Sequence, residues 1–184
     1  MKRIRTIVKW FFLIWGMVSF LALLGFGGCT FYYSLGPGNR PTNKLASKGD
    51  VRFVLNWCRL GADRTEEVVH SYASARSFTG DHLDGHAIRV SRLDVSELVF
   101  DEKQGRGWVR GDALSEVPKD AVDFAAIWLQ NQEMPWFPDI DEIRSSKMYV
   151  YVGSVKFFGT RPYIAEIIFA HPDTKMVYYF SAKM

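Results

Sequence analysis

The chain has 184 residues, of which 23 are basic and 20 acidic, giving a formal net charge of +3. Four basic residues precede residue 10 and no acidic residue occurs before residue 34, so the remainder carries 19 basic and 20 acidic groups. The folded part therefore lacks the basic excess of a nucleic-acid-binding surface, and the length suits one domain behind an N-terminal tether.

The first predicted element is a membrane helix. Residues 10–28 form a run of 19 without a charge, which as a helix would measure about 28 Å, close to a hydrocarbon core of about 30 Å. All basic residues of this region precede the run, and such residues favour the cytoplasmic side. We therefore expect residues 1–33 to anchor the chain in the cell membrane by a single pass. The N-terminus would be cytoplasmic and the domain extracytoplasmic, in the periplasm or its equivalent.

Two alternatives involve cleavage of this region. The sequence "FGGC" at 26–29 resembles the lipobox of bacterial lipoproteins, with small residues before Cys29, although Phe26 stands where that family usually has Leu. The resemblance implies removal of residues 1–28 and a lipid on Cys29. An ordinary cleaved signal peptide is the third reading, but its apolar run usually spans only about 7 to 15 residues. All three readings export the domain.

Residues 34–50 contain three glycines and two prolines without apolar periodicity, which predicts a flexible linker. The extracytoplasmic domain then comprises residues 51–184. Its one cysteine, Cys58, has no internal partner for a disulfide and is expected to be a small buried apolar residue.

Three helices are predicted in the domain. The first spans 50–61, with Asp50 as N-cap and Gly61 just past the end. A second, weaker helix follows "DRTE" at 63–66 and runs to about Ala73, although this segment is also compatible with a strand. Pro118 suits the first turn of a third helix that extends to about Gln132.

Strands fill the rest of the domain. Residues 86–93, 96–100 and 108–110 predict a central meander, and residues 147–158, 162–170 and 175–182 predict a C-terminal antiparallel sheet of three strands. The fold class is therefore α+β. Both faces of the C-terminal sheet are apolar or aromatic, so either the chain or a partner covers each face, or one face is a binding surface.

The segment "GDHLDGH" at 80–86 holds the residue types of a zinc site. His82, Asp84 and His86 would point to one side of a strand, yet the two imidazoles would lie about 13 Å apart along it. We expect a turn with surface histidines. A metal-dependent extracytoplasmic hydrolase, with His70 or His171 as a further ligand, is kept as the alternative.

The segment "MPWFP" at 134–138 places Trp136 and Phe137 between two prolines, in a loop after the third helix. Two large aromatic side chains in a loop either fold back onto the core or anchor a protein partner. These two residues are the candidate binding residues of the sequence.

No catalytic motif or phosphate-binding loop occurs in the sequence, and no cofactor is predicted. We expect a non-enzymatic, membrane-tethered binding or accessory protein, with a protein partner or a second copy of itself as ligand. A subunit of an envelope complex and an immunity-type inhibitor both belong to this class.

Overall fold

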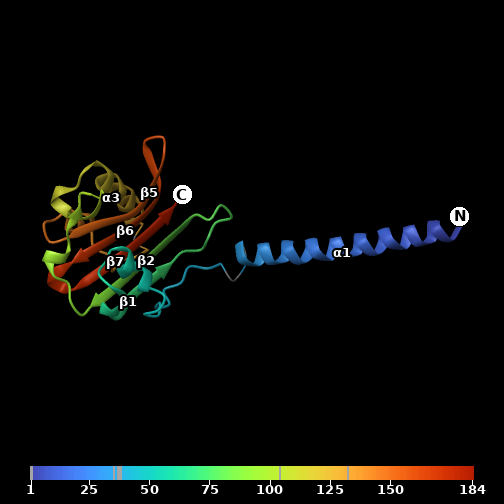
Figure 1. Cartoon of the computed structure of the whole chain (residues 1–184), viewed down its shortest axis with the longest axis horizontal. Coiled ribbons are helices and arrows are strands. Elements are labelled where there is room, and N and C mark those ends of the chain that lie inside the picture. Colours follow the sequence, from blue (N-terminus) through green and yellow to red (C-terminus); the bar gives the residue numbers. More distant parts are fainter. Residues whose placement is uncertain (1, 35, 37–38, 104, 132) are drawn as a thin grey trace.

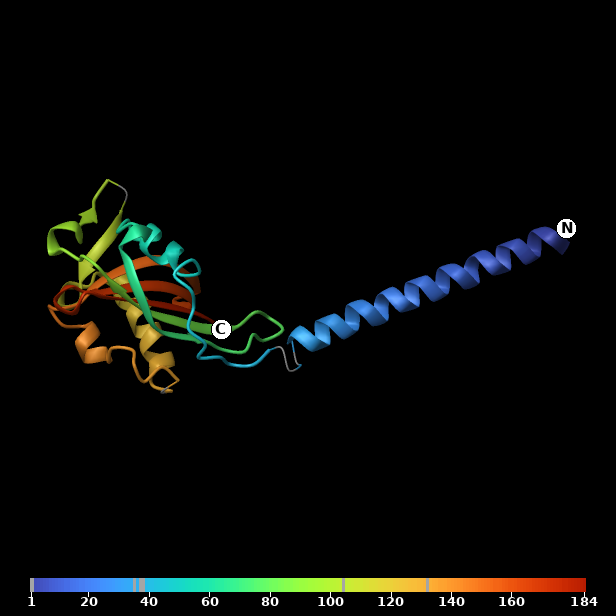
Figure 2. The same cartoon turned by 90° about the horizontal axis from the view of Figure 1, so that it is seen from below.

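Figure 1 shows the computed structural model of the chain, which describes residues 2–34, 36, 39–103, 105–131 and 133–184. Helix α1 (Lys2–Ser34) lies apart from a folded domain in both views (Figures 1 and 2). Its segment Lys9–Tyr32 is long and apolar enough to cross a membrane, and none of that segment is buried against the domain. The predicted N-terminal apolar helix is thus present.

The domain is built on one antiparallel sheet, and the described residues form seven strands in the order β1-β2-β7-β6-β5-β4-β3. The strands are β1 (Thr65–Ala73), β2 (His82–Val90), β3 (Phe100–Asp101), β4 (Arg106–Arg110), β5 (Tyr149–Phe158), β6 (Arg161–His171) and β7 (Met176–Lys183). The helices of the domain are α2 (Arg52–Trp57), α3 (Glu116–Leu129) and α4 (Ile140–Ile143). The predicted α+β class is confirmed.

The C-terminal strands β5, β6 and β7 form the predicted meander and occupy the middle of the sheet. The predicted strand at 96–100 is wrong, because residues Val95–Glu97 form a 3-10 turn and only Phe100 begins a strand. Leu93 and Leu98 are buried there, so this connection folds over the core instead of extending the sheet.

The second predicted helix, after residue 63, is also wrong. Residues Thr65–Ala73 form β1, which pairs with β2. The register shifts between Val68 and His70, so the apolar residues do not alternate with the period of two that identifies a strand. This segment is a strand because it pairs with β2, and that pairing is not visible in the pattern of its own residues.

The first helix is shorter than predicted and begins at Arg52, with Val51 as its N-cap. The carboxylate of Asp50 instead accepts hydrogen bonds from the backbone N–H of Ser47, at 2.9 Å, and from its hydroxyl, at 2.8 Å. Asp50 therefore closes the turn ahead of α2. Gly61 lies beyond the helix with a φ of 87°, a conformation that favours glycine.

Both faces of the sheet are covered by the chain itself, which explains why both are apolar. On one face, α2 and the connection after β2 bury what we call the α2-side core, including Leu55, Ile88 and Ile168. On the other face, α3, α4 and the intervening loop bury the α3-side core, including Phe169 and Phe180. Where these two layers lie, the described part of the sheet offers no open face to a partner.

Helix α3 agrees with the prediction. Ser115 is its N-cap in an extended conformation, Pro118 lies in its first turn, and Val122 and Ala125 are buried against the sheet. The predicted end at Gln132 lies outside the described residues, and the helix as described ends at Leu129. The short helix α4 follows Asp139, whose carboxylate accepts a hydrogen bond from the backbone N–H of Glu142 at 2.7 Å.

Part of the segment before α2 lies along the outer edge of β1. Thr42 exchanges backbone hydrogen bonds with Ala73, at 2.8 and 3.0 Å. Four residues later, the backbone N–H of Ala46 donates to the Ser71 hydroxyl at 3.0 Å. These contacts fix where the chain that leads to α1 joins the sheet.

Candidate binding groove at the edge of β5

Strand β5 is paired unequally on its two sides. β6 accompanies it over nearly its whole length, whereas β4 pairs only with Tyr149, Val150 and Tyr151. In the part of the chain that the structure describes, residues 152–158 have no strand partner on the β4 side. This free edge would extend about 20 Å and presents backbone N–H and C=O groups that another strand could pair with.

The edge is free because β4 turns away from it. Gly107 has a φ of 152° and lies so close to β3 that a Cβ atom there would come within 2.6 Å of the Phe100 Cα. The next residue, Trp108, donates its backbone N–H to the Val99 carbonyl at 3.1 Å and its indole N–H to the Cys58 carbonyl at 3.3 Å. These contacts hold β3 and β4 against the α2-side core. Within the described chain, residues 152–158 of β5 are therefore left without a strand on this side.

A groove of about 490 Å³ lies beside the free edge on the α3 side. Its lining comes from β3, β4, β5 and the first turn of α3, and we call it the β5 groove. The apolar side chains that line it are Phe100, Val109, Val117, Pro118, Val152 and Val155. Phe100 and Val117 are each 47% exposed, so an entering apolar group would remove surface that now contacts water.

A smaller hollow of about 260 Å³ lies on the α2 side of the same edge, lined by Trp57, Arg106, Tyr151, Gly153 and Glu166. Successive side chains of a β-strand point to opposite faces of a sheet. A strand added to β5 would thus direct alternate side chains into the β5 groove and into this hollow. An edge with a hollow on each face is the geometry by which proteins capture extended peptides.

The two binding residues predicted from sequence lie elsewhere, against the α3-side core. Phe137 is only 7% exposed and contacts the rings of Phe169 and Tyr178. Trp136 is half-buried and stacks on His70, with ring centroids 5.2 Å apart. Within this chain both side chains have internal packing partners.

The three residues of the zinc alternative lie in β2, so the predicted turn at 80–86 is wrong for residues 82–86. The alternation places all three on the α2 side of the sheet, as expected for a strand. Each has its own partner: His82 with Ser181 at 3.1 Å, Asp84 with Arg76 at 2.6 Å, and His86 with Ser71 at 3.1 Å. These contacts hold the strand in place and do not converge on a common point.

The further histidines do not complete such a site. His70 stacks on Trp136 on the α3 side of the sheet, opposite His86, which stacks on Tyr179. His171 is buried beside Glu142, with its Nε2 atom 3.5 Å from the carboxylate. Among the described residues, no group of three or more His, Cys, Asp or Glu side chains could hold a metal ion.

The pair formed by His82 and Ser181 is unsuited to nucleophilic catalysis. Ser181 is only 3% exposed, so a substrate carbonyl cannot approach its hydroxyl oxygen. The second imidazole nitrogen of His82 faces the backbone carbonyl of Gly80 at 3.0 Å. We read this arrangement as a cross-strand hydrogen bond between β2 and β7.

The two cysteines occupy contrasting positions. Cys29 is exposed on α1, near the end of the apolar segment. Cys58 is buried in the α2-side core as predicted, and burial raises the pKa of its thiol to about 12. The Cys58 thiolate, the reactive form, is thus scarce at neutral pH.

The β5 groove was not among the sequence predictions. A signal for it existed, since the predicted strand at 108–110 is far shorter than its neighbour at 147–158. A short strand beside a long one leaves part of the long strand unpaired on that side. Only the structure shows that these two strands are neighbours. Comparison with known proteins finds no matching family model, curated protein or solved structure.

Proposed function

We propose that this chain is a membrane-tethered, non-enzymatic binding protein whose extracytoplasmic domain captures an extended segment of a partner protein on the free edge of β5. The observation that carries the proposal is the combination of unpaired strand edge and hollows on both of its faces. Backbone hydrogen bonds to residues 152–158 would supply affinity, and the hollows would select the side chains of the segment. A partner of this kind suits both an envelope-complex subunit and an inhibitor of an exported protein.

The tether in this proposal is α1, uncleaved and crossing the membrane once. The support is the length of the apolar segment Lys9–Tyr32 and the position of four basic residues, Lys2, Arg3, Arg5 and Lys9, at or before its start. The intact mass of the protein extracted from membranes tests it. The full chain mass is expected, whereas loss of residues 1–28 together with a lipid on Cys29 would establish the lipoprotein reading instead.

Site-specific photocross-linking in intact cells tests the groove. A photoreactive amino acid at Val117, in the groove wall, should give a cross-link to one extended segment of one partner. The same amino acid at Ile127 is the matched control, because Ile127 lies on the same helix and is 56% exposed but does not line the groove.

A blocking variant completes this test. Phe100→Arg puts a charged side chain into the groove at a half-exposed position, so it should abolish the cross-link from Val117 while the protein stays folded. Ile127→Arg should leave that cross-link intact. Equal cross-linking from both positions, or a cross-link that survives Phe100→Arg, would contradict binding in the β5 groove.

A further inference from the structure

One end of the sheet carries two exposed phenylalanine rings at the tips of two hairpins. Phe78 lies in the loop between β1 and β2 and is 80% exposed, and Phe158 ends β5 and is 84% exposed. The register places both tips at the same end, because Lys183 of β7 pairs with His82 on one side and with Ile164 on the other.

The loop that carries Phe78 is held in one conformation by hydrogen bonds. The backbone N–H of Gly80 donates to the Ser77 carbonyl at 2.9 Å, which closes a turn with Phe78 at its second position. The carboxylate of Asp81 accepts from the hydroxyls of Ser77 and Thr79, at 2.8 and 2.6 Å. The polar groups of the turn are thus paired with one another while the ring points into solvent.

The same end of the domain receives the chain from α1. The side-chain amide of Asn39 donates to the carbonyl of Arg76, and its oxygen accepts from the Arg76 backbone N–H. Asn39 follows Tyr32, where the apolar segment of α1 ends, by only seven positions. Fully extended, this stretch reaches at most about 25 Å. The loop of Phe78 accordingly lies beside the end of α1 in both views (Figures 1 and 2).

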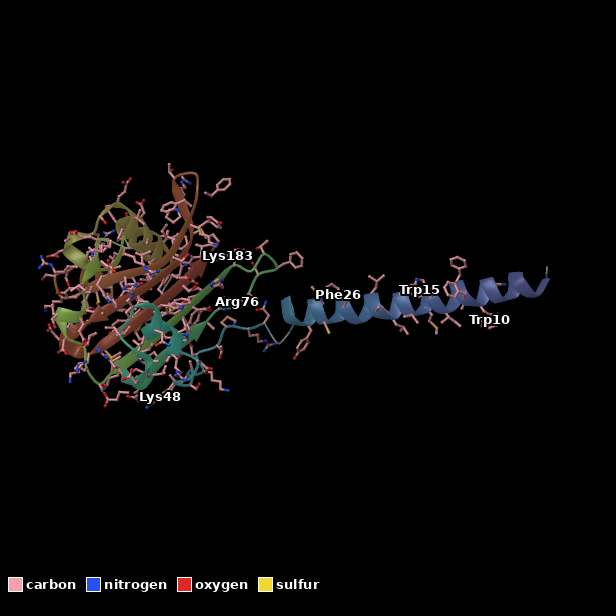
Figure 3. All side chains as sticks on the ribbon, viewed as in Figure 1. Trp10, Trp15, Phe26, Lys48, Arg76 and Lys183 are labelled. Carbon is pink, nitrogen blue, oxygen red and sulfur yellow. The ribbon has the colours of Figure 1, made fainter. Side chains whose placement is uncertain are left out.

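Basic residues lie near the two rings, beside the carboxylates of Asp81 and Asp84. Arg76 and Lys183 lie at the end of the domain that faces α1 (Figure 3), and Lys156 and Arg161 flank the tip of the β5–β6 hairpin. Arg76 forms an ion pair with Asp84, and Lys183 donates to the Thr79 carbonyl. Cations and aromatic rings together suit the interface of a bilayer with anionic lipids.

We propose that this end of the sheet is a lipid-binding surface, on which Phe78 and Phe158 enter the bilayer interface and hold the domain against the membrane. The inference rests on the proposed tether, because α1 brings this end within reach of the lipid. In addition to the tether, this surface would fix the orientation of the domain, with the opposite end of the sheet directed away from the membrane. That opposite end includes the turn at Pro172–Thr174 between β6 and β7.

Nitroxide labels on the full-length chain in vesicles of phosphatidylcholine and phosphatidylglycerol test the proposal. Phe78→Cys and Phe158→Cys carry the label in a Cys29→Ser background, since buried Cys58 is poorly reactive. Asp173→Cys, at the opposite end of the sheet, is the matched control. Collisions with oxygen, which partitions into lipid, are compared with collisions with a water-soluble nickel chelate.

Labels at 78 and 158 should collide more often with oxygen, and less often with the nickel chelate, than the label at 173. If either of them is as accessible to the chelate as the label at 173, the lipid-binding surface is wrong. A label at Tyr32→Cys separates this failure from failure of the tether: immersion at 32 with water exposure at 78 overturns only the present inference. Both aromatic side chains are exposed, so the labelled variants should melt at the temperature of the parent.

Discussion

The two long edges of the sheet are treated differently by the chain. The edge of β1 is met by the chain's own residue Thr42, which exchanges two backbone hydrogen bonds with Ala73. The edge of β5 beyond Tyr151 has no such neighbour among the described residues and has hollows on both faces. Free strand edges invite pairing with other chains and are usually covered or shortened. The contrast supports the proposal that the β5 edge binds a ligand, whereas the β1 edge is covered by the segment that leads to α1.

The largest expected effect comes from the centre of the sheet, on which both edges depend. Phe169→Ala in β6 removes a ring that is fully buried and packs against Phe137. We expect a loss of about 3 to 5 kcal/mol in the free energy of unfolding, since it removes apolar burial and leaves a cavity. Denaturant unfolding of the full chain in detergent measures it.

Phe158→Ala is the matched control for that substitution, because the Phe158 ring is almost fully exposed. It should change the free energy of unfolding by less than about 0.5 kcal/mol. Comparable losses for the two variants would mean that Phe169 is not in the core that supports the two edges.

The covered edge can be opened by one backbone change. Thr42→Pro removes the N–H that donates to the Ala73 carbonyl at 2.8 Å. The expected cost is about 1 to 2 kcal/mol. Amide hydrogen exchange at Ala73 should also be faster, because its own bond to the Thr42 carbonyl, at 3.0 Å, loses the support of the second bond. Thr42→Ala keeps the N–H and should cost less than about 0.5 kcal/mol. Equal exchange at Ala73 in the two variants would show that this edge is not covered in solution.

A smaller, pH-dependent effect is expected from His86, which lies behind the covered edge and contacts Ser71, the acceptor of Ala46. Burial lowers the pKa of His86 below its ordinary value of 6.5. The unfolded chain therefore binds the proton more readily than the native one, so stability should be full above pH 6.5 and fall as the pH drops below it.

Melting temperatures across this pH range measure the effect, and His86→Gln should flatten the dependence between neutral pH and the onset of carboxylate titration. An unchanged slope in that variant would mean that another group is responsible. The protection factor of the Ala46 amide, which corrects for slower intrinsic exchange in acid, should fall on acidification of the parent, because a proton on His86 weakens the site at Ser71.

The sequence predicted the elements whose pattern is local. Helix α3 has a cap, a first-turn proline and one buried side, all within its own residues, and the meander of β5 to β7 is marked by turn residues between apolar runs. For β1 a helix was preferred and a strand was only the alternative, because its structure depends on pairing with β2 and on the register shift after Val68. The N-cap predicted at Asp50 is wrong for a similar reason. Its carboxylate could accept a hydrogen bond from the first turn of α2 or from the preceding turn, and it accepts from Ser47 in that turn.

The candidate site was less predictable than the fold. Trp136 and Phe137 were chosen because aromatic residues in a loop suggested a partner, and the loop in fact packs on the α3-side core. The β5 groove depends on which strands are neighbours and on the turn at Gly107 that directs β4 away. Neither fact is local in the sequence. The edge is open because β4 pairs with only part of β5, and neither composition nor residue spacing shows how far two strands pair.

The most direct test of the account is amide hydrogen exchange of the full chain, free and in complex with the partner identified by cross-linking at Val117. Those amides of residues 152–158 that point away from β6 should exchange about tenfold or more slowly in the complex, because a partner strand now pairs with them. The Ala73 amide, already paired with Thr42, should be unchanged. Slowing elsewhere in the domain, with residues 152–158 exchanging as in the free chain, would contradict capture at the β5 edge.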